Sequence, residues 1–356
     1  MLFRSGMVEC DPVRPMAVPG FSFPGALFRD WVTWAGADAL TGVPMAWVLL
    51  AAIIALFWAV LYGPDIPFPV LRRRYAATDS RYLELPNGIT LHYRDVGSAD
   101  RPVVILLHGY GDSFTSWNGW VDTLGADCRV IALDLPGHGL TEAPSDFQLS
   151  SHAYLDVVRS FVMALGIDRF SLAGNSMGGG VSWLYASTYP EAVRALVLVD
   201  AAGWPLPPPE KLPIAFRILQ YRLGRWLLAR IDNKPLIVDG LRGIVRDPSL
   251  ITPAFVARWS ALQRAPGHRE ILMSAAPTSL VLASSQLLQA ITAPTLVMHG
   301  EADSLIPPEH GRLFVEHIRG AKWLPYPNVG HLPQLEIPEQ SARDALGFLV
   351  EIEGGE

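Results

Sequence analysis

Residues 170–180 read FSLAGNSMGGG, and this stretch decides the fold. Phe170–Ala173 is a short apolar run typical of a buried strand, and a helical pattern continues over Val181–Ser187. Between them stands a serine with glycine two positions away on either side. A serine at a sharp strand-to-helix turn has a strained backbone, so its neighbours must be small, and its hydroxyl projects from the sheet. The pattern predicts Ser176 as a nucleophile, with Gly174 and Gly178 as structural glycines of the turn.

Short apolar runs alternate with helical patterns on both sides of this stretch. The candidate strands are Thr90–Val96, Val103–Leu107, Val130–Leu133, Phe170–Ala173, Ala195–Val199, Thr295–Met298 and Lys322–Tyr326. Helical patterns such as Tyr154–Leu165 fall between them. This alternation predicts an α/β fold, in which helices cover both faces of a mostly parallel sheet.

The alternation stops between Trp204 and Ile291, where roughly 85 residues precede the next strand instead of the usual 2–6. The segment contains helical patterns at Ile214–Ala229 and Phe255–Arg264. We predict a helical cap over 204–291, inserted above the carboxyl ends of the strands, where open α/β sheets bind ligands. The core of the fold is then formed by residues 82–203 and 292–356.

A serine hydroxyl is a weak nucleophile and needs an adjacent base. His331 follows the run Lys322–Tyr326 and precedes a helical pattern that starts near Pro338. A histidine in the loop after the last strand is the expected base for a serine at a strand-to-helix turn. The sequence therefore predicts His331 as the general base.

The acid that orients the base should follow a strand end and precede the histidine in the chain. Asp303 in His299-Gly-Glu-Ala-Asp303 meets this requirement, and it would fix the imidazole tautomer and stabilise the imidazolium. Asp200, at the end of the run Ala195–Val199, is the rival. Glu301 would serve only if the loop register differed.

The oxyanion hole should combine the amide after the nucleophile with one from an earlier strand-to-helix loop. These amides belong to Met177 and Tyr110, and Gly109 and Gly111 let the second loop turn its amides towards the substrate. A phosphate-binding loop is the competing interpretation of these glycines. The sequence has neither G-x-G-x-x-G nor a P-loop lysine here, which argues against it.

Composition excludes several classes of function. The 356 residues carry a formal net charge of −6 and show no basic stripe, which argues against a nucleic-acid partner. The two cysteines, Cys10 and Cys128, lie far apart, so we expect neither a structural disulfide nor a cysteine-based metal site. We expect the chemistry to need no metal and no organic cofactor.

The N-terminal region contains an uncharged run, MAWVLLAAIIALFWAVLY at 45–62, with Trp47 near one end and Trp58 and Tyr62 at the other. Such a run predicts a transmembrane helix over 45–62, between a tail at 1–44 and a juxtamembrane linker at 63–81. A cleaved signal peptide or a buried helix is the alternative. Arg72–Arg74 follow the run, so the positive-inside rule places the following domain in the cytoplasm.

Five motifs occur in a fixed order: His108-Gly-Tyr-Gly111, Asp134-Leu-Pro-Gly-His-Gly139, Gly174-Asn-Ser-Met-Gly-Gly179, His299-Gly-Glu-Ala-Asp303 and Gly330-His331. Together they resemble the α/β-hydrolase superfamily over about Tyr82 to Val350. The resemblance implies an eight-stranded type of sheet. The layout with an N-terminal helix and a cap resembles membrane-anchored monoacylglycerol-lipase-like serine esterases, which implies an acyl ester as substrate.

Other branches of this superfamily can be partly excluded. Dehalogenases and epoxide hydrolases use an aspartate nucleophile, and Ser176 stands at that position here. The meta-cleavage C–C hydrolases share the text Gly-Asn-Ser-Met-Gly-Gly. They commonly have tryptophan after the histidine and a glycine-richer oxyanion loop, where this chain has Leu332 and Tyr110. A non-catalytic, membrane-tethered binding protein on the same fold is the alternative of another class.

Overall fold

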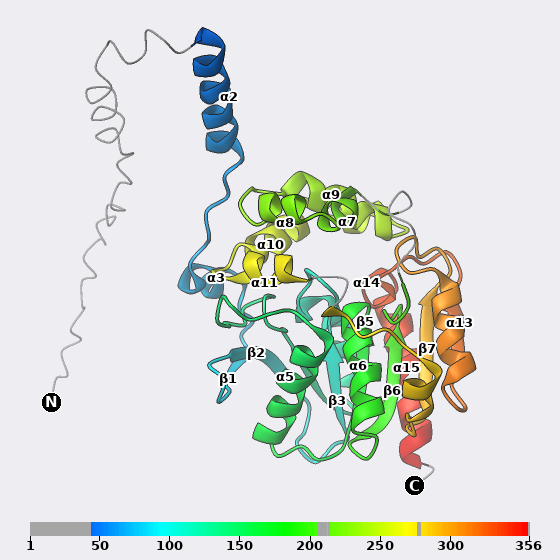
Figure 1. Cartoon of the computed structure of the whole chain (residues 1–356). Helices are drawn as coiled ribbons and strands as arrows, with labels where there is room; N and C mark the ends of the chain where they lie inside the picture. The colour runs from blue at the N-terminus through cyan, green and yellow to red at the C-terminus, as the bar shows by residue number, and fades with distance from the viewer. Residues whose placement is uncertain (1–43, 206–211, 213, 276–278, 355–356) are drawn as a thin grey trace, which may run out of the picture. The chain divides into compact units, whose positions relative to one another are not determined.

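The computed structural model describes residues 44–205, 212, 214–275 and 279–354 (Figure 1). The predicted tail at 1–44 therefore lies outside the described residues except for Pro44. The chain divides after Val60. The second unit, Leu61–Glu356, contains the sheet.

An eight-stranded sheet forms the centre of this unit, with the strand order β1-β2-β4-β3-β5-β6-β7-β8. Strand β2 pairs with β1 and β4 in antiparallel orientation, and all other neighbours are parallel. The strands are β1 (Ser80–Glu84), β2 (Thr90–Val96), β3 (Val103–Leu107), β4 (Arg129–Leu133), β5 (Phe170–Asn175), β6 (Val193–Val199), β7 (Thr295–Gly300) and β8 (Lys322–Tyr326). The prediction of a mostly parallel sheet is confirmed, and β1 is the strand that the sequence pattern missed.

Apolar side chains of the central strands alternate between two hydrophobic cores, one on each face of the sheet. Ile105 and Leu107 of β3 belong to one core, and Val104 and Leu106 belong to the other. The first core is covered by α5 (Ser151–Ala164), α6 (Met177–Thr188), α12 (Ser285–Gln289) and α13 (Pro308–His317). The second is covered by η1 (Phe114–Trp117), α4 (Asn118–Leu124) and α15 (Pro338–Gly354). Burial on both faces explains why these strands read as continuous apolar runs.

Polar caps define where several helices begin. The hydroxyl of Ser150 accepts a hydrogen bond from the amide of Ala153 at 3.1 Å, at the start of α5. The hydroxyl of Thr252 accepts one from the amide of Phe255 at 3.1 Å, and Pro253 occupies the first position of α10 (Pro253–Gln263). Both arrangements satisfy amides that have no partner inside the helix.

The predicted cap region folds into a group of short helices above the sheet (Figure 1). They are α7 (Ile214–Leu219), α8 (Arg222–Leu228), α9 (Lys234–Ile244), η3 (Pro248–Leu250), α10 and α11 (His268–Ser274). The continuous helical pattern predicted over Ile214–Ala229 is interrupted, because the amide of Tyr221 bonds to the carbonyl of Ile218 at 3.1 Å. A Cβ on Gly224 would lie 2.2 Å from the same carbonyl, so glycine allows α8 to pack closely on α7.

The segment predicted as a linker at 63–81 contains a helix, α3 (Phe68–Tyr75). Leu71 of α3 is buried in a small apolar cluster with Leu140 and Leu262. The amide of Ile66 donates to the carbonyl of Arg264 at 2.7 Å. This segment is therefore packed against α10 rather than being a free connection.

The apolar run at 45–62 forms the helix α2 (Met45–Leu61), which has 17 residues. At 1.5 Å per residue it is about 26 Å long, less than the ~30 Å hydrocarbon core of a bilayer. Within the residues that the structure describes, none of the helices combines the length and the apolar character needed to cross a membrane. The predicted transmembrane helix is therefore not supported.

The start of α6 packs closely against the end of β3. A Cβ on Gly178 would lie 2.3 Å from the carbonyl oxygen of Leu107, and one on Gly174 would lie 2.3 Å from the carbonyl oxygen of Gly178. No side chain fits at either position, because such distances are well inside van der Waals contact. Gly178 is required by the close approach of α6 to the end of β3, and Gly174 by the close approach of α6 to the end of β5.

We predict that Gly178→Ala lowers the free energy of unfolding by about 1–3 kcal/mol, as overpacking of a close contact does. Gly347→Ala is the control, because Gly347 lies in the exposed part of α15 with no heavy atom within 4 Å of a built Cβ. It should stabilise the protein by about 0.5–1 kcal/mol through helix propensity. Urea unfolding followed by tryptophan fluorescence measures both, and equal effects of the two changes would contradict the packing argument.

Candidate active site

Ser176 lies at the turn between β5 and α6 with φ 53° and ψ −118°. Its amide donates to the carbonyl of Val199 at 3.0 Å, and its carbonyl accepts from the amides of Gly180 and Ala202, each at 2.9 Å. A positive φ in a residue other than glycine is strained and persists only where the surroundings hold it. The turn therefore has the strained geometry that the sequence predicts.

His331 and Asp303 form a buried pair. The Nδ1 of His331 lies 2.7 Å from Oδ2 of Asp303, and the second oxygen of Asp303 accepts from the amides of Leu305 and Ile306 at 2.8 and 3.0 Å. When Nδ1 donates to Asp303, Nε2 of the imidazole remains as the proton acceptor. The loops after β7 and β8 thus bring together the acid and the base that the sequence predicts.

The charge of Asp303 depends on this pair. Burial opposes ionisation of the carboxyl, but the charge and the hydrogen bond of His331 outweigh it and hold the pKa of Asp303 below its usual value of 3.8. The site therefore holds a carboxylate behind the imidazole at neutral pH.

Asn175 and Glu336 hold the loop that carries His331, and sequence reasoning missed both. The side-chain amide of Asn175 donates to the carbonyls of His331 and Val199 at 3.1 and 3.2 Å. The carboxylate of Glu336 accepts from the amides of Gly330 and Leu332 at 3.0 and 3.3 Å. For Asn175 the sequence did contain a signal, because it is a polar residue at the end of a buried strand and lies inside the serine motif. Glu336 has no signal in the sequence.

The predicted oxyanion loop lies beside Ser176. Gly111 has a φ of 75°, which favours glycine, and Gly109 and Tyr110 line the same pocket as Ser176. Among the hydrogen bonds of the described residues, none uses the backbone amide of Tyr110 or of Met177 as a donor. Met177 is the first residue of α6, where helix amides are free to bind an anion. The tyrosine hydroxyl donates to the carbonyl of Leu272 at 2.9 Å, which ties this loop to the cap.

Asp134, the first residue of the motif Asp134–Gly139, holds neighbouring segments through both oxygens of its carboxyl group. One oxygen of Asp134 accepts from the amide of Phe114 at 2.8 Å. The other accepts from the amide of Leu140 at 2.9 Å and lies 2.6 Å from Nδ1 of His92. Asp134 therefore fixes the segment that directly follows the oxyanion loop.

Asp200 and Glu301, the other candidates for the acid, are placed differently. Glu301 is exposed. Asp200 is fully buried next to the pair, and the ligand atoms of Asp200, Asp303 and His331 lie within 4.8 Å of one another. These are also the atoms that would hold a metal ion, but Nδ1 of His331 and both oxygens of Asp303 already have hydrogen-bond partners.

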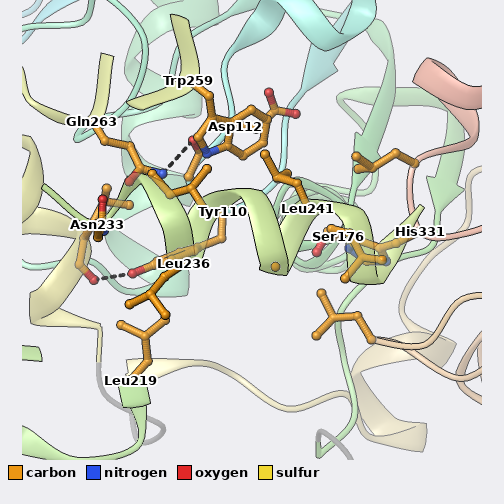
Figure 2. Close-up of a pocket in the computed structure, with 18 of the residues that line it drawn as sticks. Tyr110, Asp112, Ser176, Leu219, Asn233, Leu236, Leu241, Trp259, Gln263 and His331 are labelled. Carbon is orange, nitrogen blue, oxygen red and sulfur yellow. Dashed lines mark hydrogen bonds between the residues drawn. The ribbon is translucent and has the colours of Figure 1, made fainter. Parts of the chain in front are cut away.

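Ser176 and His331 face one pocket between the sheet and the cap (Figure 2). It contains about 870 Å³ of space, including open solvent. The apolar residues that line it are Leu219, Leu228, Leu236, Ile237, Leu241, Ile244, Trp259, Leu272, Met273, Leu305 and Leu332. The polar residues besides Ser176 and His331 are Tyr110, Asp112, Asn175, Asn233 and Gln263, and no lysine or arginine is among the described lining residues. The pocket suits a neutral, largely apolar molecule.

We predict that Asn175→Asp lowers both stability and the reactivity of Ser176. The change keeps the shape of the side chain but removes the donor that holds the His331 carbonyl, and an unpaired buried group costs about 1–3 kcal/mol. Asn87→Asp, at an exposed turn position, makes the same chemical change away from the site. Thermal unfolding and the rate of labelling by a fluorophosphonate measure the two effects. Equal behaviour of both variants would show that Asn175 does not position His331.

Ionisation of the buried pocket residue Asp112 makes the free energy of unfolding depend on pH. Burial raises its pKa to about 7, against the hydrogen bond that the Ser113 amide donates to it. Because the folded pKa lies above the unfolded value of 3.8, ionisation disfavours folding, so this contribution falls as pH rises from about 4 to 7.

Asp112→Asn should therefore leave stability nearly unchanged at pH 4 and raise it at pH 8. The gain is at most about 4 kcal/mol, since one pKa unit corresponds to about 1.4 kcal/mol. Urea unfolding of both proteins at the two pH values checks this. A difference that does not grow with pH would contradict a raised pKa of Asp112.

Comparison with known proteins agrees with this architecture. Residues 102–234 match the family model described as the alpha/beta hydrolase fold. The 2-hydroxymuconate semialdehyde hydrolase of Pseudomonas sp. (strain CF600) is 30% identical over 269 residues, which cover 74% of this chain and 92% of that protein. A meta-cleavage product hydrolase from Pseudomonas fluorescens IP01 has a TM-score of 0.67 and 26% identity, over 76% of this chain and 97% of that one. A protein of Acinetobacter baumannii AYE assigned as a lipase has a TM-score of 0.65 and 26% identity, over 83% and 99%. The chain belongs to the α/β-hydrolase family.

Proposed function

We propose that this hydrolase cleaves carboxylic esters with an apolar acyl chain, through an acyl-enzyme formed on Ser176. One observation carries the proposal: Ser176 and His331 face an apolar pocket, with the carboxylate of Asp303 hydrogen-bonded behind His331. This is the arrangement that activates a serine hydroxyl for acyl transfer.

The mechanism has two steps. The Nε2 of His331 takes the proton of the Ser176 hydroxyl as Oγ attacks the ester carbonyl, and the imidazolium then returns that proton to the leaving alcohol. A water molecule next gives its proton to His331 and attacks the acyl-enzyme, and the proton passes to Oγ as the acid leaves. Asp303 keeps its charge throughout and stabilises the imidazolium.

The oxyanion of each tetrahedral intermediate would be bound by the backbone amides of Tyr110 and Met177. In the described residues neither amide donates a hydrogen bond within the protein. Met177 directly follows Ser176 in the chain, and Tyr110 lines the same pocket as Ser176. One donor of this kind is worth about 3–4 kcal/mol in the transition state.

The lining of the pocket supports a neutral ester. A carboxylate bound there would lose its hydration, and no lysine or arginine among the described lining residues faces it. Arg225, from the neighbouring helix α8, donates to the carbonyl of Leu219 at 2.9 Å. The long apolar wall built by α7, α8 and α9 favours a lipid-like substrate such as an acylglycerol.

The placement of the enzyme in the cytoplasm stays a prediction.

A second candidate is a C–C bond hydrolase of the meta-cleavage type. It is favoured by the identity to 2-hydroxymuconate semialdehyde hydrolase and by that to the 2-hydroxy-6-oxo-6-phenylhexa-2,4-dienoate hydrolase of Comamonas testosteroni, which is 31% identical over 271 residues. The second of these names describes a substrate with a carboxylate. No lysine or arginine among the described lining residues would pair with that carboxylate, and this is the reason to rank this reaction second.

We predict that a fluorophosphonate probe labels the purified protein and that Ser176→Ala abolishes labelling. Ser182→Ala is the control, because Ser182 lies in α6, the helix that follows Ser176, with its hydroxyl bonded to the carbonyl of Gly178. Labelling that persists in Ser176→Ala would exclude Ser176 as the nucleophile. If the wild type is folded but is not labelled, the alternative of a non-catalytic binding protein on the same fold would be favoured.

The two reactions are separated by the substrates that the labelled enzyme turns over. A series of p-nitrophenyl esters and monoacylglycerols should show kcat/KM rising with acyl length, because each buried methylene adds about 0.8 kcal/mol of binding. The dienoate named above should be turned over far more slowly. The reverse order would make the C–C hydrolase the first candidate.

A further inference from the structure

Asp200 is a buried carboxyl group that the proposed mechanism does not use. It directly follows β6, is fully buried and has a φ of 44°. Only two other non-glycine residues among those described have a positive φ, Ser176 and Asn328. Aspartate tolerates this conformation better than most residues, but it still requires support from the surroundings.

The hydrogen bonds of Asp200 are incomplete. Its Oδ1 accepts from the amide of Gly300 at 3.0 Å. Its Oδ2 is buried and has no hydrogen-bond partner in the described part of the chain. The nearby Nε2 of His299, 3.5 Å from Oδ1, donates instead to the carbonyl of Ile306 at 2.9 Å. A buried carboxyl oxygen without a donor is unfavourable if it is charged.

Asp200 lies next to the Asp303–His331 pair of the active site. Its ligand atom lies within 4.8 Å of those of Asp303 and His331. Glu336 and the hydroxyl of Tyr326 also interact with it electrostatically, and neither brings a positive charge. Two buried carboxyls this close do not ionise together, so the pair holds one proton.

The environment decides which carboxyl holds that proton. Burial and the charge of Asp303 raise the pKa of Asp200 well above its usual value. Asp303 has the opposite balance, because His331 and two backbone amides favour its charged form. The proton therefore belongs on Asp200, and its free oxygen is the one that can donate.

We propose that Asp200 is a positioning residue: a neutral carboxyl that donates a hydrogen bond to Asp303 and takes over as the acceptor for His331 when Asp303 is removed. The proposal rests on the proposed function, because it concerns the same base. In the intact enzyme it means that the two carboxyls present a single negative charge to the imidazole. The proton on Asp200 stays there when His331 receives the proton of Ser176.

A double-mutant cycle tests the proposal, with hydrolysis of p-nitrophenyl butyrate as the readout. Asp200→Asn keeps a neutral donor and should retain activity within about 3-fold of the wild type, whereas Asp303→Ala should lower kcat/KM by about 100-fold. Asp200→Asn/Asp303→Ala should lower it by about 10,000-fold, because no carboxylate then remains for His331. If Asp200→Asn has the same small effect in both backgrounds, Asp200 does not replace Asp303.

The pH profile adds a readout that a structural role would not change. In Asp303→Ala the like charge beside Asp200 is gone, so Asp200 ionises more easily and activity should rise with pH as it does so. His331, His299, Glu336 and Tyr326 are the other titrating groups around it, and they remain in both variants. The rise should be absent from Asp200→Asn/Asp303→Ala. A rise of the same size in the double variant would overturn the proposal.

Infrared spectroscopy tests the proton itself and needs neither turnover nor Asp303→Ala. At pH 8, above the pKa of about 7 of Asp112, the wild type should show the carbonyl band of a protonated carboxyl that Asp200→Asn lacks. Identical spectra would overturn the proposal even if esters are hydrolysed. If the band is present but no ester is hydrolysed, the proposed function is wrong, whereas the proposal of a neutral Asp200 beside a charged Asp303 still holds.

Discussion

The close contact between the first turn of α6 and the end of β3 is the constraint on which the site depends. It leaves no room for a side chain at Gly178, and the same turn of α6 leaves none at Gly174 at the end of β5. Ser176, between the two glycines, has a positive φ of 53°. The strain is held by buried hydrogen bonds of the serine backbone to Val199 and Ala202. Ser176 is thus placed by the backbone, and Asp303 and His331 are brought to the same site by the loops after β7 and β8.

Much of the fold could be predicted because both faces of the sheet are buried. The apolar run Val103–Leu107, for example, coincides with the central strand β3 to the residue. Strand β1 was missed because it is an edge strand with mostly exposed side chains, so it has no apolar run. The apolar composition of 45–62 suggested a membrane-spanning helix. The helix is present as Met45–Leu61, but it is shorter than such a span requires.

The site was predictable where each group follows a strand end, as Ser176, Asp303 and His331 do. Its second layer was not, because those contacts join residues far apart in the chain. Asn175 and His331 are 156 positions apart, and Asp200 meets the loop after β7 from the end of β6. Sequence position alone made Asp200 a rival of Asp303, whereas the structure places the two carboxyls side by side with only Asp303 bonded to the imidazole.

The backbone amide of His331 donates to the carbonyl of Ile244 at 2.8 Å, and the hydroxyl of Ser304 donates to the carbonyl of Gly243 at 2.7 Å. The end of α9 is thus fastened to the loops that carry the base and the acid. The cap is therefore joined to the loops of the candidate site at two separate places, the end of α9 and the Leu272 carbonyl of α11, which accepts from the Tyr110 hydroxyl. Cap exchange between relatives, in nature or in the laboratory, would have to leave residues 243–246 with the core, because moving them would displace the base.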